Sequence, residues 1–327
     1  MTHAALGGLI GQVAARRDAA PGERTAFVSG AAVVASLPDV DHVLEWAGAE
    51  PYLLYHRTAT HSLLFCAAVI AIVALLASAQ RTRRVAVVVA ALLSHLGLDV
   101  LTPFGTGLLW PFSAQLTSLD ILPIAAPWLV CLSVVGLAFV FLRARRDSTL
   151  ARRTALLALA AVGAYLVLSA AVTARAARAL PDARAELVVP DPWAPLSAVL
   201  FVREGASIAE YSVGPSGEPV LAQRTSIIRE DTAELLAAPR IAMLTRRFRV
   251  PIASNGPGVV FIDDLSYDVV TRGAKPIRIV VPERRGAPVP DRARVEQRAL
   301  GVQPFAWLAV VGTAWILGRR RRRAPAC

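Results

Sequence analysis

The order of apolar and polar positions along the 327-residue chain predicts a membrane part followed by a soluble part. Four segments have the length or apolarity of membrane-spanning helices: residues 62–79, 85–102, 121–142 and 154–174. The first contains no charged residue and reaches about 27 Å at the helical rise of about 1.5 Å per residue, close to the thickness of a hydrocarbon core. The pattern therefore predicts four long membrane helices.

Three further apolar runs are shorter. Residues 304–318 carry two tryptophans suited to the membrane interface, and we expect a fifth membrane helix there. Residues 3–15 and 25–37 are too short to span comfortably, so they are expected to form two half-spanning or interfacial helices.

Arginine clusters at the ends of the apolar runs predict the orientation. They lie between the two short helices, between the first two long ones, between the third and fourth, and after the last: Arg16 and Arg17; Arg81, Arg83 and Arg84; Arg143, Arg145, Arg146, Arg152 and Arg153; and Arg319 to Arg323. Cytoplasmic loops are enriched in arginine, so these connections are expected inside. Residues 175–303 are then outside, with Arg175 and Arg178 as the notable exceptions to the rule.

Residues 180–300 change character. Prolines become frequent, the runs A-V-L-F-V, G-V-V-F-I and I-R-I-V-V are typical of strands, and Asp231 to Ala238 resembles a helix. We therefore predict an all-α integral membrane domain with four to five transmembrane helices plus two short N-terminal helices, and a C-terminal extracytoplasmic α+β domain. The expected boundaries are 1–175, 180–300, and 304–327 for the last membrane helix and its Arg-rich cytoplasmic tail.

Composition supports a membrane protein. The chain is 55% hydrophobic with mean hydropathy +0.51, which is too apolar for an ordinary soluble protein of this size. Its net charge of +11 would normally suggest nucleic acid as a partner. Because the arginines gather at the ends of apolar runs, we predict a multi-pass protein of the bacterial inner membrane, with membrane lipid and no nucleic acid as partner.

All five histidines fall within the first 95 residues, each near a carboxylate, another histidine or a hydroxyl. Histidine and carboxylate together are typical metal ligands. The predicted topology brings all the candidate ligands to the outer side of the membrane: His3, Asp39, Asp41, His42, His56, His61, His95 and Asp99. We therefore predict one metal centre there, containing a divalent cation, zinc with manganese or magnesium as alternatives.

Each motif also has a simpler interpretation. His95 and Asp99 project from one helix face, where they would bind metal or form a hydrogen bond that holds helices together. The segment from Asp39 to His42 follows a proline, and Pro-Asp also forms ordinary turns and caps. His61 could be a polar interfacial residue, with Thr60 or Ser62 as the N-cap of the next helix.

Three motifs, in order and spacing, resemble those of the YdjM-type inner-membrane family of metal-dependent hydrolases. They are Pro38-Asp39-Val40-Asp41-His42, His56-Arg57-Thr58-Ala59-Thr60-His61-Ser62, and the stretch from Ser94-His95 through Asp99, Leu101-Thr102, Gly105 and Leu108-Leu109-Trp110-Pro111. The resemblance covers roughly residues 1–145. The chain departs from the family at Thr58, where glycine is common, and at Ala126-Pro127, where many members have Asp-Pro. The second departure removes one potential carboxylate from a two-metal site.

The same arrangement is similar, at the level of pattern, to zinc-dependent phospholipase C. That resemblance implies phosphoester cleavage, in which divalent metal lowers the pKa of bound water. We predict a membrane-bound metal-dependent hydrolase acting on a lipid or lipid-linked phosphoester, with Asp41 as general base and Arg57 contacting the substrate phosphate. Arg57 would otherwise be a positively charged interfacial anchor.

Two other classes of protein remain as alternatives. One is a non-catalytic membrane protein with a structural polar or metal cluster, whose 180–300 domain binds an unknown protein partner. The other is a transporter that uses His95 and Asp99 as a proton relay; it predicts duplicated halves, which the sequence does not show. Among lesser candidates, Trp110 is expected to anchor at the interface, Asp120 to cap the third long helix, and Asp263 and Asp264 to form a strand-end turn.

Overall fold

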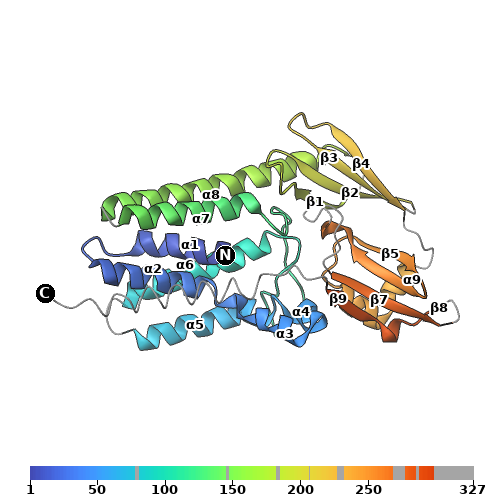
Figure 1. Ribbon diagram of the computed structural model, residues 1–327, viewed down its shortest axis with the longest axis horizontal. Coiled ribbons are helices and arrows are strands. Elements are labelled where there is room, and N and C mark those ends of the chain that lie inside the picture. Colours follow the sequence, from blue (N-terminus) through green and yellow to red (C-terminus); the bar gives the residue numbers. More distant parts are fainter. Residues whose placement is uncertain are drawn as a thin grey trace.

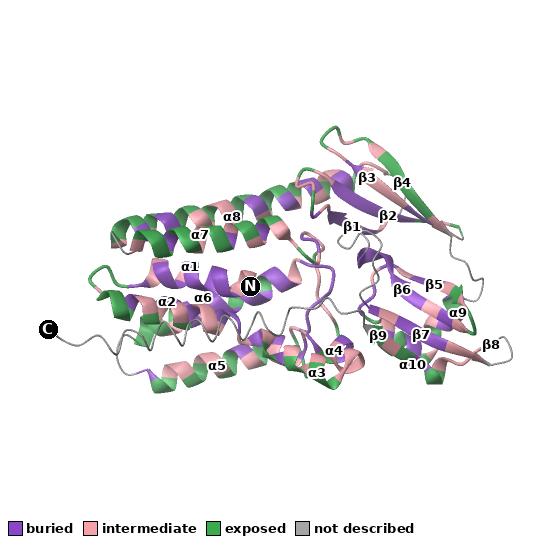
Figure 2. Ribbon diagram, in the orientation of Figure 1, coloured by how far each residue is buried: buried purple, intermediate pink, exposed green. Residues whose placement is uncertain are grey.

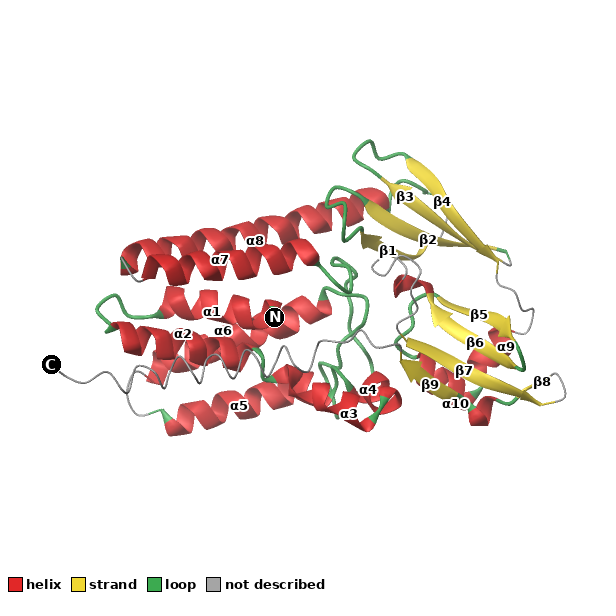
Figure 3. Cartoon of the chain, in the orientation of Figure 1, coloured by secondary structure: helices red, strands yellow, loops and turns green. Residues whose placement is uncertain are grey.

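The computed structural model has a body of long helices and a second body that contains the strands with two short helices (Figure 1). Figure 3 shows the long helices side by side, with both sheets at one end of them. The structure describes residues 1–77, 81–144, 147–181, 185–205, 207–226, 232–267, 277–284 and 287–297. The predicted helix 304–318 and the arginines 319–323 lie outside these residues.

Six helices make up the helical body: α1 Thr2–Ala14, α2 Pro21–Ala35, α5 Leu63–Leu76, α6 Arg81–Val100, α7 Pro127–Ala144 and α8 Ser148–Ala176. Short helices connect α2 to α5: η1 Pro38–Val43, α3 Leu44–Ala47, α4 Ala49–Tyr55 and η2 Ala59–His61. The α1–α2 connection, the end of α7 and the start of α8 lie at the end of the body away from the sheets (Figure 1). The short helices lie at the opposite end, facing the strands.

Two described helices, α7 and α8, are long and apolar enough to cross a membrane. Two bent pairs, Pro21–Ala35 with Pro38–Ala47 and Ala49–His61 with Leu63–Leu76, each qualify when taken as one broken span, with bends of 58° and 48°. The described residues therefore contain two to four candidate spans. The predicted span at 85–102 corresponds to α6, which carries three arginines and Asp99 and is not among these candidates.

Apolar side chains cover the outside of the helical body, as expected for a surface in contact with lipid. Figure 2 shows exposed residues along α5, α7 and α8. They include Ile72, Leu75 and Leu76 on α5, Phe139 and Leu142 on α7, and Leu157 and Val167 on α8.

Helices α1 and α2 pack closely because α1 carries two glycines on the face toward α2. A Cβ on Gly7 would lie 2.4 Å from the Cβ of Ala35, and one on Gly11 would lie 2.7 Å from the Cβ of Ala31. Small residues four apart let helix backbones approach in this way in membrane proteins. The close approach matters for the site, because His3 is at the start of α1 and Asp39 follows α2.

The third long helix begins later than the sequence pattern predicted. It starts at Pro127 instead of residue 121, with a proline in the first turn, where the missing N–H is tolerated. Asp120 has a φ of +55°, so it lies outside the helix and does not cap it. Its carboxylate instead pairs with Arg249 of the strand-rich body, with an N–O distance of 2.6 Å. The expectation of a helix cap at Asp120 is therefore wrong.

The first sheet is an antiparallel meander in the order β1-β2-β3-β4, formed by Ala185–Pro190, Ala198–Glu204, Ser207–Val213 and Pro219–Ser226. One face of this sheet packs on the last turns of α8, where Val172 and Ala176 share a core with Leu200 and Val202. Helix α8 is 29 residues long, so it extends from the helical body directly into this core.

The second sheet has the order β5-β6-β7-β8, with β9 also paired to β7: Pro251–Gly256, Val259–Asp264, Ile277–Arg284, Ala287–Pro288 and Arg294–Gln297. Helices α9 Thr232–Ala237 and α10 Pro239–Thr245 share its core with Leu53 and Leu54 of α4. Val250 and Ile252 also pack against residues of the first sheet. The predicted strands at A-V-L-F-V, G-V-V-F-I and I-R-I-V-V are confirmed as β2, β6 and β7, and the helix near 231–238 as α9.

Candidate metal centre

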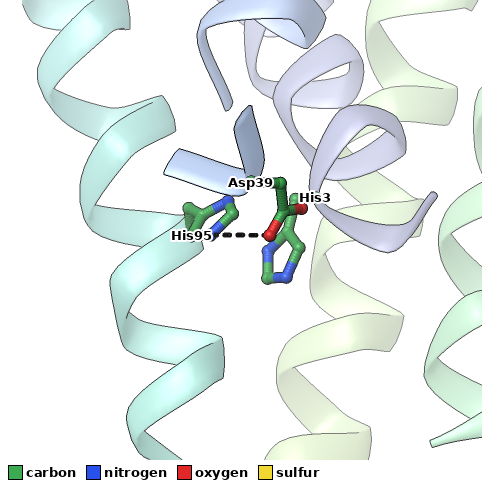
Figure 4. A group of neighbouring side chains, drawn as sticks. All are labelled: His3, Asp39 and His95. Carbon is green, nitrogen blue, oxygen red and sulfur yellow. Dashed lines mark ion pairs between the residues drawn. The ribbon is translucent and has the colours of Figure 1, made fainter. Parts of the chain in front are cut away.

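The candidate ligands meet at the end of the helical body that faces the sheets. His3 comes from α1, Asp39 from η1 and His61 from η2, whereas His95 and Asp99 project from α6. Figure 4 shows His95 directed toward the Asp39 carboxylate, with the His3 ring beside them. Two groups of these side chains satisfy the spacing of metal ligands: His3, Asp39 and His95, and His61, His95 and Asp99.

Three ligand atoms lie at almost equal separations. The Nε2 atoms of His61 and His95 are 3.1 Å apart, and each lies 3.2 Å from Oδ2 of Asp99. Asp39 Oδ1 lies 3.7 Å from the first Nε2 and 3.6 Å from the second. Tetrahedral zinc with bonds of about 2.0–2.1 Å needs ligand atoms about 3.3–3.4 Å apart. The two imidazole nitrogens and Asp99 Oδ2 therefore have nearly the spacing of three ligands of a tetrahedral zinc site, and Asp39 Oδ1 lies beside them.

Hydrogen bonds on the far side of each ring determine which nitrogen carries the proton. His95 Nδ1 lies 2.6 Å from the backbone oxygen of Ala35, which only accepts, so this nitrogen is the N–H donor. His61 Nδ1 faces Thr60 Oγ1 at 3.1 Å and Asp41 Oδ2 at 3.3 Å. In the neutral imidazoles both Nε2 lone pairs are thus directed at Asp99. This arrangement is typical of metal-binding histidines.

The buried lone pairs at this position fit a cation. His61 and His95 are 0% exposed and Asp99 is 1% exposed. Oδ2 of Asp99 has no hydrogen-bond partner among the described residues, and neither has Nδ1 of His3. An isolated buried carboxylate oxygen is unfavourable, and a metal ion between it and the two imidazoles would satisfy all three atoms. The residues present therefore fit a divalent metal.

The two groups share His95, so they are alternative positions for one ion and not two separate metal sites. The Nδ1 hydrogen of His95 is bonded to Ala35, which leaves a single lone pair on Nε2. One lone pair serves one metal ion, so separate ions cannot both use this ring. The His3 ring stacks on His95 at a centroid distance of 3.8 Å, and its Nε2 lies 3.4 Å from Asp99 Oδ1. His3 consequently lies at the edge of the centre.

Asp41 belongs to neither group and is surrounded by donors of the histidine-rich loop. Its Oδ1 accepts from His56 Nδ1 at 2.8 Å, and its Oδ2 accepts from Thr60 Oγ1 and from the backbone N–H of Arg57, both at 3.0 Å. Arg57 has a φ of +57°, uncommon for a residue with a side chain. Asp41 thus holds this turn in the conformation that directs His61 inward.

The Arg57 side chain points at the centre from the other side of Asp99. Its Nη2 lies 2.9 Å from Asp99 Oδ1, and its Nη1 donates to Thr102 Oγ1 at 2.7 Å. The guanidinium also lies over the ring of Phe104. One Asp99 oxygen is therefore paired with arginine, which leaves Oδ2 to face the imidazoles.

His42 and His56 lie beside the centre. His42 Nδ1 bonds Glu45 Oε1 at 2.7 Å, and its Nε2 lies 3.9 Å from Asp39 Oδ1. The His56 ring stacks on Tyr52 and lies 4.6 Å from that of His42 between centroids. Glu45 was missed in the sequence, although its position three residues after His42 is the helical spacing that places both on one face.

Arg247 of the strand-rich body is a second residue that sequence reasoning missed. It donates to the backbone oxygens of Leu53 at 2.9 Å and Gly105 at 3.1 Å, donates also to that of His56, and lies over Phe104. Burial, together with the charges of Arg246 and Arg57, lowers the pKa of Arg247 to about 9, so it stays charged at neutral pH. No local motif marks this arginine, because its partners are more than 140 residues away.

The remaining candidates have structural contacts. Asp264 accepts from the backbone N–H groups of Arg249, Val250 and Ser266, and Asp263 pairs with Arg278 at 2.7 Å. Both aspartates lie within β6, as its last two residues, and Arg278 is directly opposite Asp263 on β7, so the strand-end turn expected after the strand does not contain them. Ser62 Oγ accepts from the N–H of Phe65 and is thus the N-cap of α5.

Fold and site together define a helical membrane protein with a buried histidine–aspartate centre at one end and a β-sheet domain over that end. A family comparison gives the particular relationship: residues 1–177 match the YdjM inner membrane protein family, and the chain belongs to it. The resemblance inferred from the three motifs is confirmed. Comparisons with curated proteins and with solved structures gave no match.

Proposed function

We propose that this protein is a membrane-bound metal-dependent hydrolase that acts on a lipid or lipid-linked phosphoester. The observation that carries the proposal is the convergence of His61 Nε2, His95 Nε2 and Asp99 Oδ2 within 3.1–3.2 Å of one another. In the neutral form, each imidazole carries its proton on Nδ1, so both Nε2 atoms are free to bind a metal. The proposed ligands are these three residues, with Asp39 as the exchangeable fourth ligand that water or substrate would replace.

Zinc is the metal proposed, with manganese or magnesium as alternatives. Two imidazoles and two carboxylates suit zinc, whereas magnesium prefers oxygen ligands throughout. When bound, such a metal polarises a phosphoryl oxygen and lowers the pKa of a coordinated water. Asp39 is the most accessible of the proposed ligands, with its side chain 19% exposed, so substrate would approach from its side.

Residues beside the centre would orient the ligands and accept a proton from the attacking water. The Nδ1–H of His42 donates to Glu45, which leaves its Nε2 as an acceptor directed toward Asp39. We therefore assign the general base to His42. Asp41 was the base predicted from sequence, but its oxygens accept from His56, Arg57 and Thr60, which suits orientation of His61 instead.

A lipid substrate is proposed because large apolar side chains surround this end of the helical body. Trp46, Tyr55, Trp110 and Phe112 are all exposed, as aromatic residues are at the level of lipid headgroups. The α1–α2 connection, which carries Arg16 and Arg17, and the start of α8, which carries Arg152 and Arg153, lie at the opposite end (Figure 1). By the positive-inside rule, the centre and residues 180–300 are proposed to be extracytoplasmic.

The metal is tested by measuring the zinc and manganese content of detergent-purified protein. About one equivalent is expected for the wild type, and a loss is expected for His61→Ala and Asp99→Ala. His42→Ala is the matched control: it removes an imidazole outside the proposed ligand set and should keep the metal. Undiminished metal in both ligand variants, each shown to be folded by size-exclusion chromatography, would contradict the proposed centre.

Hydrolysis is tested separately with phospholipid and with a generic phosphodiester, before and after chelation and metal replacement. Turnover that requires metal, and that falls in His42→Ala at unchanged metal content, is expected. A metal-replete protein without turnover of either substrate would favour the second candidate, a non-catalytic membrane protein with a structural metal or polar cluster. The near-complete burial of His61, His95 and Asp99 is the observation in favour of that alternative.

A further inference from the structure

A second polar site lies at the end of the helical body away from the metal centre. A cavity of about 320 Å³ opens where the α1–α2 connection meets the start of α8. Five arginines line this basic pocket: Arg16, Arg17, Arg24, Arg152 and Arg153. Arg16, Arg17 and Arg24 are close in sequence, and the fold brings Arg152 and Arg153 of α8 to them.

The positive charge in the basic pocket is only partly balanced. Arg16 pairs with Asp18, and Arg24 is buried and donates to backbone oxygens of the α1–α2 connection, including that of Arg17 at 3.1 Å. In the described part of the chain, no ion pair joins a carboxylate to Arg17, Arg152 or Arg153. Three guanidinium groups are thus available to an anion.

The N-terminus of α8 adds to this field. Helix α8 is 29 residues long and begins at Ser148, which lines the cavity together with Thr149. The partial positive charge of a helix N-terminus favours anions. Asp147 caps one N–H, since its Oδ1 accepts from Thr149 at 2.7 Å, so this contribution supplements the arginines and does not replace them.

One wall of the pocket is apolar and continues onto the lipid-facing surface. Leu156 lines the cavity and is exposed, and Leu150 and Leu157 are exposed on the same helix. A free phosphate needs no such wall, whereas a phospholipid places its headgroup among cations and its acyl chains along apolar helix surface.

We propose that the basic pocket binds the headgroup of an anionic phospholipid from the leaflet opposite the metal centre. Arginines that serve only to orient the protein in the membrane need not line a shared cavity. The arginines at the start of α6 provide the comparison, because Arg81, Arg83 and Arg84 are exposed and do not line the basic pocket. Basic pockets between membrane helices are known to select anionic lipids. The proposal does not depend on the proposed hydrolase activity.

The test is lipid retention by the full-length protein in native mass spectrometry, with phosphatidylglycerol or cardiolipin as the probe and phosphatidylcholine for comparison. The pocket variant carries Arg17→Gln, Arg152→Gln and Arg153→Gln. The control variant carries Arg81→Gln, Arg83→Gln and Arg84→Gln, which removes the same charge from the same end. We expect affinity for anionic lipid to fall at least about tenfold in the pocket variant and less than about twofold in the control.

An equal fall in both variants would overturn the proposal, since it would show attraction by general surface charge. Unchanged retention in the pocket variant would overturn it as well. Inorganic phosphate that displaces the lipid at micromolar concentration would identify a free anion as the ligand and reject the lipid. Metal content measured on the same samples should stay at the wild-type value, which shows that the centre at the other end is intact.

Discussion

At the scale of single residues, the centre depends on groups that do not bind metal themselves. Ala35 contributes only its backbone oxygen, yet that oxygen determines which nitrogen of His95 carries the proton. Asp41 and Thr60 together determine in the same way that Nδ1 of His61 carries the proton. Partners of this kind orient a ligand and increase its basicity.

Replacing Asp41 by asparagine tests this role. The amide keeps the shape but has one acceptor oxygen in place of two, so His56 and the turn at Arg57 lose part of their support. Metal affinity should fall by about 10–100-fold, as is usual for such partners, while the direct ligands remain. Chelator competition measures the affinity. Asp18→Asn, an exposed aspartate at the other end, is the control, and equal affinity of D41N and wild type would contradict the assignment.

At the scale of elements, the contact between α1 and α2 positions both sides of the centre. Helix α1 begins beside His3, and α2 ends at the Ala35 backbone oxygen and leads into Asp39. Because Gly7 and Gly11 lie against Ala35 and Ala31, a shift of either helix would move ligands relative to α6. The close approach of the α1 and α2 backbones is therefore required for the geometry of the centre.

Gly7→Ala should therefore destabilise the protein and weaken metal binding. The added Cβ would lie 2.4 Å from the Cβ of Ala35 and 2.6 Å from the Ala31 oxygen, so the helices must separate. Gly30→Ala, in α2, is the same chemical change with nothing within 4 Å, and alanine there should be neutral or stabilising by up to about 1 kcal/mol. Thermal unfolding in detergent and metal content compare the two. A lower melting temperature in Gly30→Ala than in Gly7→Ala would contradict this packing.

At the scale of the whole molecule, the β-sheet domain is hydrogen-bonded and ion-paired to residues 50–56, the segment that leads into His61. Arg247 binds the backbone at Leu53, His56 and Gly105, Arg249 pairs with Asp120, and Arg240 pairs with Glu50 at 2.8 Å. Leu53 and Leu54 also belong to the core of the second sheet. The domain thereby restrains the segment that carries His56 and His61.

Arg247→Ala should loosen that segment without unfolding either body. Hydrogen exchange is expected to increase at residues 53–58 and 104–107, and metal affinity to fall several-fold, because the turn at Arg57 loses its outer support. Arg203→Ala, which removes a surface pair with Glu186 in the first sheet, should change neither. If exchange in both segments matches the wild type, Arg247 does not hold the loop.

Metal removal should also act on the whole molecule. The proposed ligands come from η1, η2 and α6, so a bound ion would join segments up to 60 residues apart. Binding to the folded state alone stabilises it, by about 2.7 kcal/mol at a free metal concentration of 100 Kd. Chelation should therefore lower the melting temperature of the wild type but not of His61→Ala. An equal decrease in melting temperature in both proteins would show that chelation acts at a site other than the proposed centre.

Much of this protein was predictable from local sequence. Apolar runs predicted α7 and α8, β-branched runs predicted β2, β6 and β7, and the three motifs identified the family. The grouping of five histidines before residue 96 indicated that they act together. These features are local, because helix and strand periodicity and motif spacing are properties of neighbouring residues.

The tertiary structure decided what each group does. Only the fold brings the Ala35 oxygen to His95, 60 residues away, and Arg247 to His56, 191 residues away. It also placed Asp120 in an ion pair with Arg249 and brought two arginines of α8 to the three near the α1–α2 connection, around one cavity. Hydrogen bonds, proton positions and cavities depend on distances between segments remote in the chain, and no local pattern of residue types encodes those distances.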